Sequence, residues 1–446
     1  MTRTPAALPA RDRYRSAADL AAVEPRPLPP LGSDERVGLP APVWRSLPCG
    51  LRAVAVHDPH AATVEVQLLL PYTPATQRES ALADLLADAV LRGAEHELRA
   101  GRTAEWFIVT AHAPSDELAG LLQDLTLAFT GGSTPGDPVA RARARLARRA
   151  HAANAHPATT ARDALQRMRF GPLGCFAGLP APDAIAALTT ADVEAARREM
   201  LRLHGAHLVI VGDIASERAM DLAEEAFAEC PTGEGTQAAA PSAPAAGGPP
   251  ARKTVHRPGA LQSHFLMAFP AEAPAHDDYP ALALAHTVFA GYFSSRLVLR
   301  IREGLGLTCH VASSFDRTLG THGILLEGSC ATADTETVLA EVGDEWAGTA
   351  TRPFTPSEVE NARRHQLGML AALRASPAAL AQFLSTLCCW DIPLDWTDHY
   401  ATHLRTVSRA RVAEAARTYL SPGPTASVVV GDATVLTPEL RGDEPR

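Results

Sequence analysis

The chain has 446 residues, of which 46% are hydrophobic and 20% charged, a composition typical of globular proteins with enough mass for at least two cores. Because the formal net charge is -9 and no apolar run approaches the roughly 18 residues of a membrane-spanning helix, we expect neither nucleic acid nor a membrane as a partner. Seven cysteines, an odd number without a Cys-x-x-Cys pair, predict reduced thiols and a cytoplasmic location.

The chain begins with a predicted flexible tail over residues 1–40. The tail mixes Arg, Asp, Glu and Pro and has no apolar segment of the kind that signal peptides contain. Residues 45–57 then predict a hairpin that turns at Pro48-Cys49-Gly50, with Leu51, Ala53 and Ala55 alternating with Arg52, Val54 and Val56 in its second arm. A second strand is predicted at residues 63–71.

The next predicted element, over residues 80–93, has the apolar spacing of a helix and ends at Gly93. A strand at residues 105–113 and an amphipathic helix at residues 115–130 follow. Another helix begins near Pro138 and carries many arginines. These arginines predict a solvated face, and the alternative is a basic wall for an acidic peptide.

The end of this first half recurs later in the chain. A helix followed by a buried strand and Gly-Asp occurs twice, and Val193 and Val412 each lie 19 residues before the glycines, Gly212 and Gly431. The equal spacing predicts an internal repeat.

Residues 230–252 are rich in Ala, Pro and Gly and predict a linker, because such a segment cannot pack a core. The predicted domains are therefore residues 41–229 and 253–432, followed by a tail over 433–446. Each domain mixes hairpin-like strands with helices, which predicts an α+β class with mainly antiparallel sheets.

The segment over residues 293–311 is the most distinctive part of the second half. A helix capped by its serines is predicted to end at Gly304, and a strand follows it. On pattern alone the charged residues at the helix end predict a solvated turn. These residues are Arg300, Arg302 and Glu303.

This segment resembles the second half of a known peptidase family. The string Ser294-Ser295-Arg296-Leu297, followed by Ile301-Arg302-Glu303 and Gly306-Leu307, is similar to the best-known segment there in pitrilysin/insulinase-like inverzincin peptidases. Residues 257–263 resemble the strand that opens that half. The resemblance covers about residues 42–432. It implies two tandem homologous domains, each a mainly antiparallel sheet flanked by helices, that enclose a peptide-holding chamber.

The family carries His-x-x-Glu-His on the first-domain helix, where two histidines bind Zn²⁺ and the glutamate activates water. In the register of the resemblance, the histidine positions are Asp84 and Asp88 and the glutamate position is Ala87. The third ligand falls near Arg148 or Arg149, and an arginine there would repel a cation. The resemblance therefore implies no metal and no cofactor in this chain. Two aspartates holding a hard metal remain a minor alternative.

In the second domain the family uses an arginine and a tyrosine to hold the substrate carbonyl. Arg302 matches the arginine, whereas Cys309 replaces the tyrosine with a shorter and weaker donor. As a nucleophile, Cys309 has a possible base only in His310, whose side chain we expect on the opposite strand face. His399 and His403 have metal-compatible spacing but no acidic partner set, so we expect them on a surface helix.

Two functions fit this sequence. The first is a non-catalytic subunit, inactive alone, of a heterodimeric zinc metallopeptidase that processes or degrades peptides. It would contribute half the chamber and Arg302 to a homologous partner subunit that carries His-x-x-Glu-His and the zinc. The alternative is a non-enzymatic scaffold or peptide-binding protein of the same fold. Peptidase activity with unconventional metal ligands is a third and weaker option.

Overall fold

The computed structural model describes residues 40–89, 96–130, 138–176, 178–200, 203–230 and 251–436. The predicted N-terminal tail up to residue 39, residues 231–250 of the predicted linker, residues 437–446 of the C-terminal tail and the Gly93 end of the helix lie outside the described residues. The described residues belong to one compact unit.

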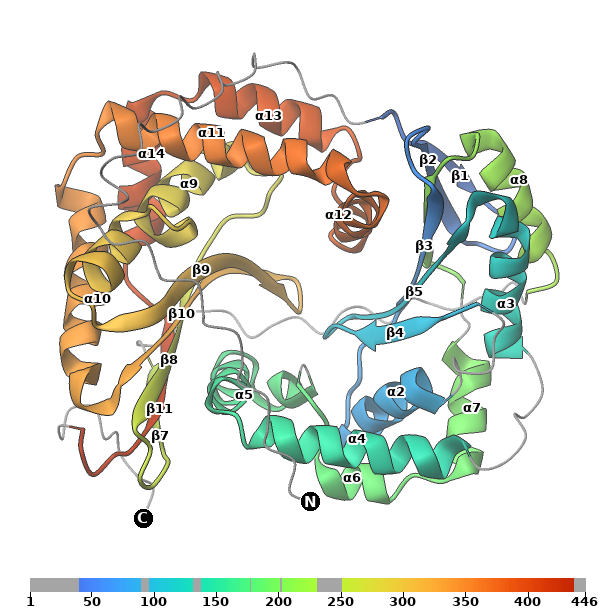
Figure 1. Ribbon diagram of the computed structural model, residues 1–446, viewed down its shortest axis with the longest axis horizontal. Helices are drawn as coiled ribbons and strands as arrows, with labels where there is room; N and C mark the ends of the chain where they lie inside the picture. The colour runs from blue at the N-terminus through green and yellow to red at the C-terminus, as the bar shows by residue number, and fades with distance from the viewer. Residues whose placement is uncertain are drawn as a thin grey trace, which may run out of the picture. The chain divides into compact units, whose positions relative to one another are not determined.

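The first half of the chain forms a six-stranded sheet, sheet 1, in the order β1-β2-β6-β3-β5-β4 (Figure 1). Strands β2 and β6 run parallel, and the other neighbours run antiparallel. The strands are β1 (Val43–Ser46), β2 (Arg52–His57), β3 (Thr63–Pro71), β4 (Arg99–Arg102), β5 (Trp106–Pro114) and β6 (His207–Gly212).

The second half forms a five-stranded sheet, sheet 2, in the order β7-β11-β8-β10-β9. Here β7 and β11 are the parallel pair. The strands are β7 (Ala251–His256), β8 (Gln262–Pro270), β9 (Thr308–Thr318), β10 (Thr321–Ala331) and β11 (Ala426–Gly431).

Helices flank both sheets. In the first half they are α2 (Gln77–Ala89), α3 (Leu118–Thr130), α4 (Pro138–Asn154), α5 (Pro157–Phe170), α6 (Pro182–Ala186), α7 (Thr190–Met200) and α8 (Ser216–Ala226). In the second half they are α9 (Tyr279–His286), α10 (Thr335–Thr351), α11 (Pro356–Ala372), α12 (Pro377–Cys389), α13 (Trp396–Thr406) and α14 (Arg409–Ala415). The shorter elements η4 (Thr287–Gly291), η5 (Val298–Gly304) and η8 (Ala416–Leu420) are π-helical. The predicted α+β fold with two mainly antiparallel sheets flanked by helices is confirmed.

The two sheets share their topology and their register. Strands β2-β6-β3-β5-β4 of sheet 1 correspond in order to β7-β11-β8-β10-β9 of sheet 2. His57 lies opposite Gly212, and His256 lies opposite Gly431. Neither glycine leaves room for a Cβ atom. A Cβ atom on Gly212 would lie 2.7 Å from the Thr63 carbonyl oxygen, and one on Gly431 would lie 2.4 Å from Ser263 Oγ. A glycine at the strand end is therefore required by close packing in each half.

Each half packs one helix on the other half's sheet. Helix α12 buries Leu380, Leu384 and Leu387 against side chains of sheet 1 that include Val56, Leu69 and Val211 (Figure 1). In return, α5 buries its apolar face against β8, β10 and β11 of sheet 2. Both helices begin with proline in the first turn after a capping residue, as expected at a helix start. Each sheet is therefore covered on one face by a helix from the other half of the chain.

Ion pairs also connect the halves. Arg169 of α5 contacts Asp316 of β9 at 2.8 Å, and Arg317 of β9 contacts Glu105 at 3.2 Å. All four side chains are less than one fifth exposed. Burial raises the pKa of Glu105, and the nearby Arg317 opposes that shift.

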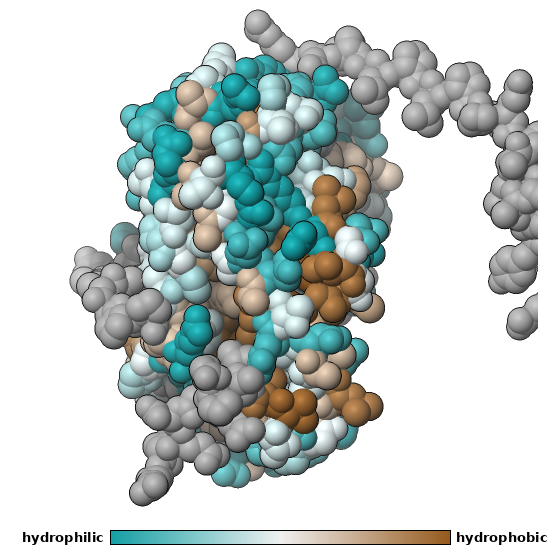
Figure 2. Space-filling model, turned by 90° about the vertical axis from the view of Figure 1, so that its left-hand side faces the viewer, coloured by the Kyte–Doolittle hydropathy of each residue, from teal (hydrophilic) through white to brown (hydrophobic). Residues whose placement is uncertain are grey.

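On the side of the molecule that Figure 2 shows, hydrophilic side chains predominate and a few apolar patches lie between them. Within the described ranges, none of the helices taken singly is long and apolar enough to cross a membrane. The pair over residues 356–375 and 377–389 has the length and composition together, but it is bent by 115°.

Candidate functional site

Helix α2 carries Asp84, Ala87 and Asp88, the residues that the resemblance places at the positions of the zinc motif. Its apolar residues Ala81, Leu85, Leu86 and Ala89 are buried in the core of the first half, because they recur at helical spacing. Asp84 lies one turn before Asp88, so both carboxylates project from neighbouring turns of one helix. Asp84 is buried and Asp88 is partly buried.

Asp84 is paired with an arginine from β4. Arg102 Nε and Nη2 each lie 3.1 Å from one carboxylate oxygen of Asp84, and the Arg102 side chain is only 4% exposed. Arg102 Nη2 also donates to Ser80 Oγ and to the Gly178 carbonyl. Burial raises the pKa of Asp84, while Arg102 and the more distant Arg149 act in the opposite direction.

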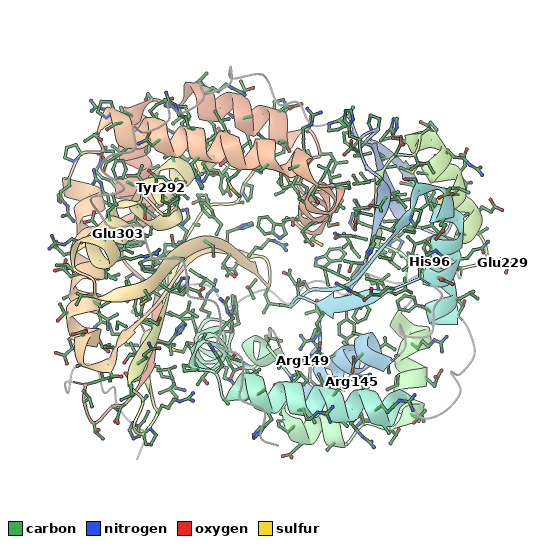
Figure 3. The ribbon with its side chains drawn as sticks, viewed as in Figure 1. His96, Arg145, Arg149, Glu229, Tyr292 and Glu303 are labelled. Atoms are coloured by element: carbon green, nitrogen blue, oxygen red, sulfur yellow. The ribbon has the colours of Figure 1, made fainter. Side chains whose placement is uncertain are left out.

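Asp88 is paired with an arginine from α4, the helix beside α2 (Figure 3). Arg145 Nε lies 2.9 Å from Asp88 Oδ2, and Arg145 Nη2 donates to the Asp88 carbonyl at 3.2 Å. Arg149 follows Arg145 by one turn on α4. Positive side chains therefore surround both carboxylates.

These residues do not fit a zinc ion. Both aspartates already accept from guanidinium groups, and a metal would have to displace or approach those cations. Zinc prefers three or more ligands of the His, Cys or carboxylate type, and among the described residues no group of three or more such side chains could hold a metal ion. The same argument applies to the alternative of a hard metal on Asp84 and Asp88.

Arg302 lies on η5 of the second half. The sequence predicted a helix that stops at Gly304, and the structure has one here whose backbone is π-helical from Val298 to Gly304. Two neighbouring arginines are engaged, because Arg296 pairs with Glu358 at 2.6 Å and Arg300 with Glu341 at 2.7 Å. Arg302 is about half exposed and lies 3.5 Å from its exposed neighbour Glu303.

Cys309 lies on β9, close along the chain to η5, and its side chain is exposed. A β-bulge displaces it from the β9–β10 ladder, since Thr308 pairs with Cys330 and His310 with Ser329. His310 is also exposed and lies 3.7 Å from Glu327.

Three further histidines, on α13 and just before β4, occupy different environments. His399 and His403 are exposed on α13. His96, in contrast, is held between Asp124 at 2.8 Å and Glu117 at 3.3 Å (Figure 3). The hydrogen bond with Asp124 raises the pKa of His96.

Sequence reasoning missed the roles of Arg102 and Arg145. Arg102 lies on β4, whose sequence Arg-Ala-Gly-Arg gives no strand signal. A signal for Arg145 was present, because α4 carries arginines at helical spacing where the family needs a third ligand. Pairing each with a carboxylate required the fold.

Comparison with known proteins agrees with this geometry. Residues 187–365 match the model of the family described as the Peptidase M16 inactive domain. No curated protein gives a significant sequence match.

Several solved structures share the fold. A peptidase M16 inactive domain from Pseudomonas fluorescens superposes with a TM-score of 0.75 at 18% identity, over 88% of this chain and 98% of that one. A protease from Helicobacter pylori gives 0.75 at 15% identity, over 88% and 100%. A chain of Complex III2 from Candida albicans gives 0.69 at 15% identity, over 87% and 95%.

The matched family model is that of an inactive domain, and the helix that would bear the zinc motif instead carries two aspartates bound by arginines. Residues 187–365 are therefore similar to the inactive domain of M16 peptidases, and the described residues share the fold of solved M16 peptidase-like structures.

Proposed function

We propose that this protein is the non-catalytic subunit of a heterodimeric zinc metallopeptidase that processes or degrades peptides. In this proposal its two domains, residues 41–229 and 253–432, form half of a peptide-holding chamber. A homologous subunit with His-x-x-Glu-His forms the other half and holds the zinc. We further propose that the complex works in the cytoplasm, which the free thiols of the described cysteines favour.

The ion pairs that Asp84 and Asp88 of α2 make with arginines from β4 and α4 are the main support for the proposal. They keep the first-half site folded without metal, because each carboxylate has a cationic partner. Meanwhile Arg302 keeps an exposed guanidinium at the end of η5, where it can donate two hydrogen bonds to a peptide carbonyl. A chain that retains the substrate arginine but not the metal ligands suits a supporting subunit better than a lone enzyme.

Co-expression with a homologue that bears His-x-x-Glu-His tests the proposal. We expect light scattering to give the mass of a one-to-one pair, with zinc and peptide cleavage in the pair and neither in this chain alone. A chain that stays separate from such homologues, or a pair whose activity equals that of the partner alone, would rule out the proposal.

The second candidate is a non-enzymatic scaffold or peptide-binding protein. It is favoured by the similarity to a chain of Complex III2, a large assembly. Stable association with peptides or proteins without any cleavage, in every combination of subunits, would support it.

A further inference from the structure

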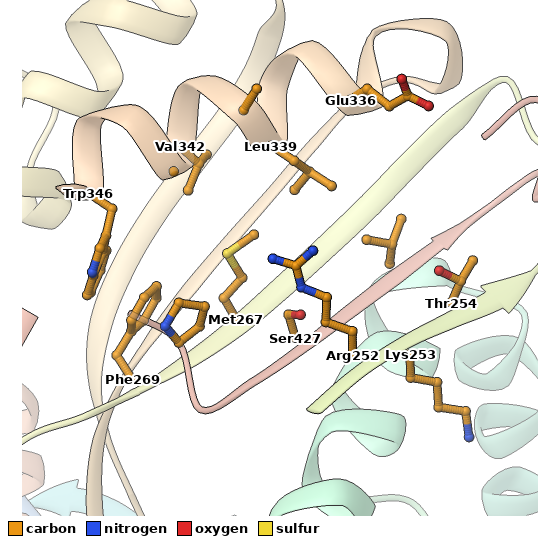
Figure 4. A pocket seen from close by; sticks show the side chains of 14 residues that line it. Arg252, Lys253, Thr254, Met267, Phe269, Glu336, Leu339, Val342, Trp346 and Ser427 are labelled. Atoms are coloured by element: carbon orange, nitrogen blue, oxygen red, sulfur yellow. The ribbon is translucent and has the colours of Figure 1, made fainter. Parts of the chain in front are cut away.

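A cavity of about 450 Å³ lies between α10 and the outer face of sheet 2 (Figure 4). We call it the α10 pocket. Its apolar lining consists mainly of Met267, Phe269, Leu339, Val342, Trp346 and Val429. The rings of Phe269 and Trp346 stack with centroids 3.4 Å apart, so this end of the pocket is rigid.

The internal repeat shows what fills the equivalent place in the first half. In the first half the corresponding space, between α3 and β2, is covered by α8. Helix α8 has 11 residues and buries Ala219, Met220 and Ala223 completely in the first core, and Phe227 just after it is also buried. Residues 432–436, the described residues after β11, contain no counterpart of α8.

The side chains beneath the pocket differ from their counterparts in the first half. In sheet 1, Ala53 of β2 lies opposite Leu208 of β6, and both are buried under α8. In sheet 2 the same register places Arg252 of β7 opposite Ser427 of β11. The two positions that are apolar in the first half are therefore polar in the second. Polar side chains here fit an occupant with charged as well as apolar groups.

Three charged residues line the pocket, Glu336 on α10 and Lys253 and Arg252 on β7. The side chain of Arg252 stands up toward Met267 and Leu339, whereas that of Lys253 points away from them (Figure 4). In the first half an arginine performs a comparable role, since Arg45 of β1 contacts Glu217 of α8 at 2.7 Å and Asp221 at 3.0 Å. An arginine at this edge of the sheet is therefore suited to the acidic face of a covering helix.

We propose that the α10 pocket binds an acidic amphipathic helix of another polypeptide, in the position that α8 takes in the first half. Apolar residues at i, i+3 or i+4 and i+7 of that helix insert against Leu339, Val342 and Trp346, and a carboxylate pairs with Arg252. Three turns, about 16 Å, are enough to span the equivalent of α8. This site does not depend on the proposed peptidase partnership.

A labelled peptide with the sequence of residues 214–229, which contains α8, is the probe. We expect saturable binding to the full chain by fluorescence anisotropy. Arg252→Glu should weaken binding about tenfold or more, because it replaces an attractive charge by a repulsive one. A peptide with Glu217, Asp221 and Glu224 changed to lysine should recover affinity for Arg252→Glu. Lys253→Glu makes the same charge change at a neighbouring lining residue whose side chain points away from Met267 and Leu339 (Figure 4), so it should weaken binding much less than Arg252→Glu.

Three results would overturn the proposal. One is the absence of saturable binding, and another is equal affinity for the wild type and Arg252→Glu. The third is loss of binding in Arg45→Glu but not in Arg252→Glu, which would mean that the peptide exchanges with α8 itself. Binding of dodecanoate without binding of the peptide would instead identify a small amphiphile as the occupant and would also contradict a helix.

Discussion

Arg102 and Asp84 form a buried bidentate ion pair, in which two guanidinium nitrogens each lie 3.1 Å from a different carboxylate oxygen. In the register of the resemblance, Asp84 stands at the helix position where the peptidase family places a zinc-binding histidine. In this protein the partner of Asp84 is a fixed cation from β4. The contribution of this ion pair to stability can be measured.

Arg102→Met should destabilise the protein. It leaves the Asp84 carboxylate buried without its cation, and breaking such a pair typically costs about 3–5 kcal/mol. Urea unfolding measures the loss. Arg99→Met on the same strand, at an exposed position, should cause no measurable change. The double variant Arg102→Met with Asp84→Leu should recover most of the stability, and additive losses would refute the pairing.

Zinc should not return when the motif alone is restored. The combined change Asp84→His, Ala87→Glu and Asp88→His rebuilds His-x-x-Glu-His on α2, but the guanidinium groups of Arg102 and Arg145 remain beside it. We expect elemental analysis to find no stoichiometric zinc in this variant. Adding Arg149→Glu, which turns a nearby cation into a ligand, should raise zinc content. Full occupancy without that change would show that the arginines do not oppose a metal.

Arg302→Ala should lower peptide turnover by the proposed heterodimer about a hundredfold, on the order of 3 kcal/mol, if its guanidinium stabilises the developing charge. Folding and assembly should be intact, because the side chain is half exposed. Arg300→Ala serves as the control, since the exposed Arg300 side chain already pairs with the partly buried Glu341. Turnover that is the same for the wild type and Arg302→Ala would leave this subunit a structural role only.

The stability of the protein should fall as the pH drops from about 6.5 toward 4, and His286 should account for part of this. Burial lowers the pKa of His286 to about 4. Below its ordinary pKa the unfolded chain therefore takes up a proton that the folded protein does not, which costs about 1.4 kcal/mol per pH unit.

His286→Gln isolates this contribution, because an amide can still bond to Ser313, which His286 Nε2 reaches at 2.6 Å. Between pH 6.5 and 5.0 the variant should lose about 2 kcal/mol less of its unfolding free energy than the wild type. His207, whose pKa burial also lowers to about 4, keeps a similar slope in both proteins. Parallel pH curves would contradict the assignment to His286.

Two glycines should respond in opposite ways to alanine. Gly212→Ala places a Cβ atom 2.7 Å from the Thr63 carbonyl oxygen, and overpacking of this kind costs about 1–3 kcal/mol. Gly368 on α11 has open space around it, so Gly368→Ala should stabilise the helix by about 0.5–1 kcal/mol. Thermal unfolding of both variants gives the comparison. A stabilised Gly212→Ala protein would mean that β3 can move away.

Local pattern predicted most elements of sheet 1. The hairpin at residues 45–57 and the strand at 63–71 correspond to β1–β2 and β3. Short apolar runs next to turn residues predict strands even where, as in β2, both faces are buried. Strand β4 was missed, since it is held by pairing with β5 rather than by its own residues. The exchange of α5 and α12 was missed as well, because an apolar helix face does not indicate which sheet will cover it.

The candidate site, too, could be predicted only in part from the sequence. The resemblance could place Asp84, Ala87 and Asp88 at the zinc-motif positions, because motif spacing is a local property of the sequence, and this assignment stays a prediction. The partners of the aspartates depend on contacts between elements that are 18 and 57 residues apart in sequence. No property of a single segment encodes such a contact.

The exchange of α5 and α12 has a consequence during synthesis on the ribosome. Sheet 1 has all its strands once β6 ends at Gly212, yet Leu380, Leu384 and Leu387 of its covering helix are made much later. At translation rates of about 5–20 residues per second, the intervening stretch of about 165 residues takes roughly 10 to 30 s. During that time Val56, Leu69 and Val211 lack the helix that covers them. We therefore expect the nascent chain to need a chaperone that binds exposed apolar surface until α12 has been made.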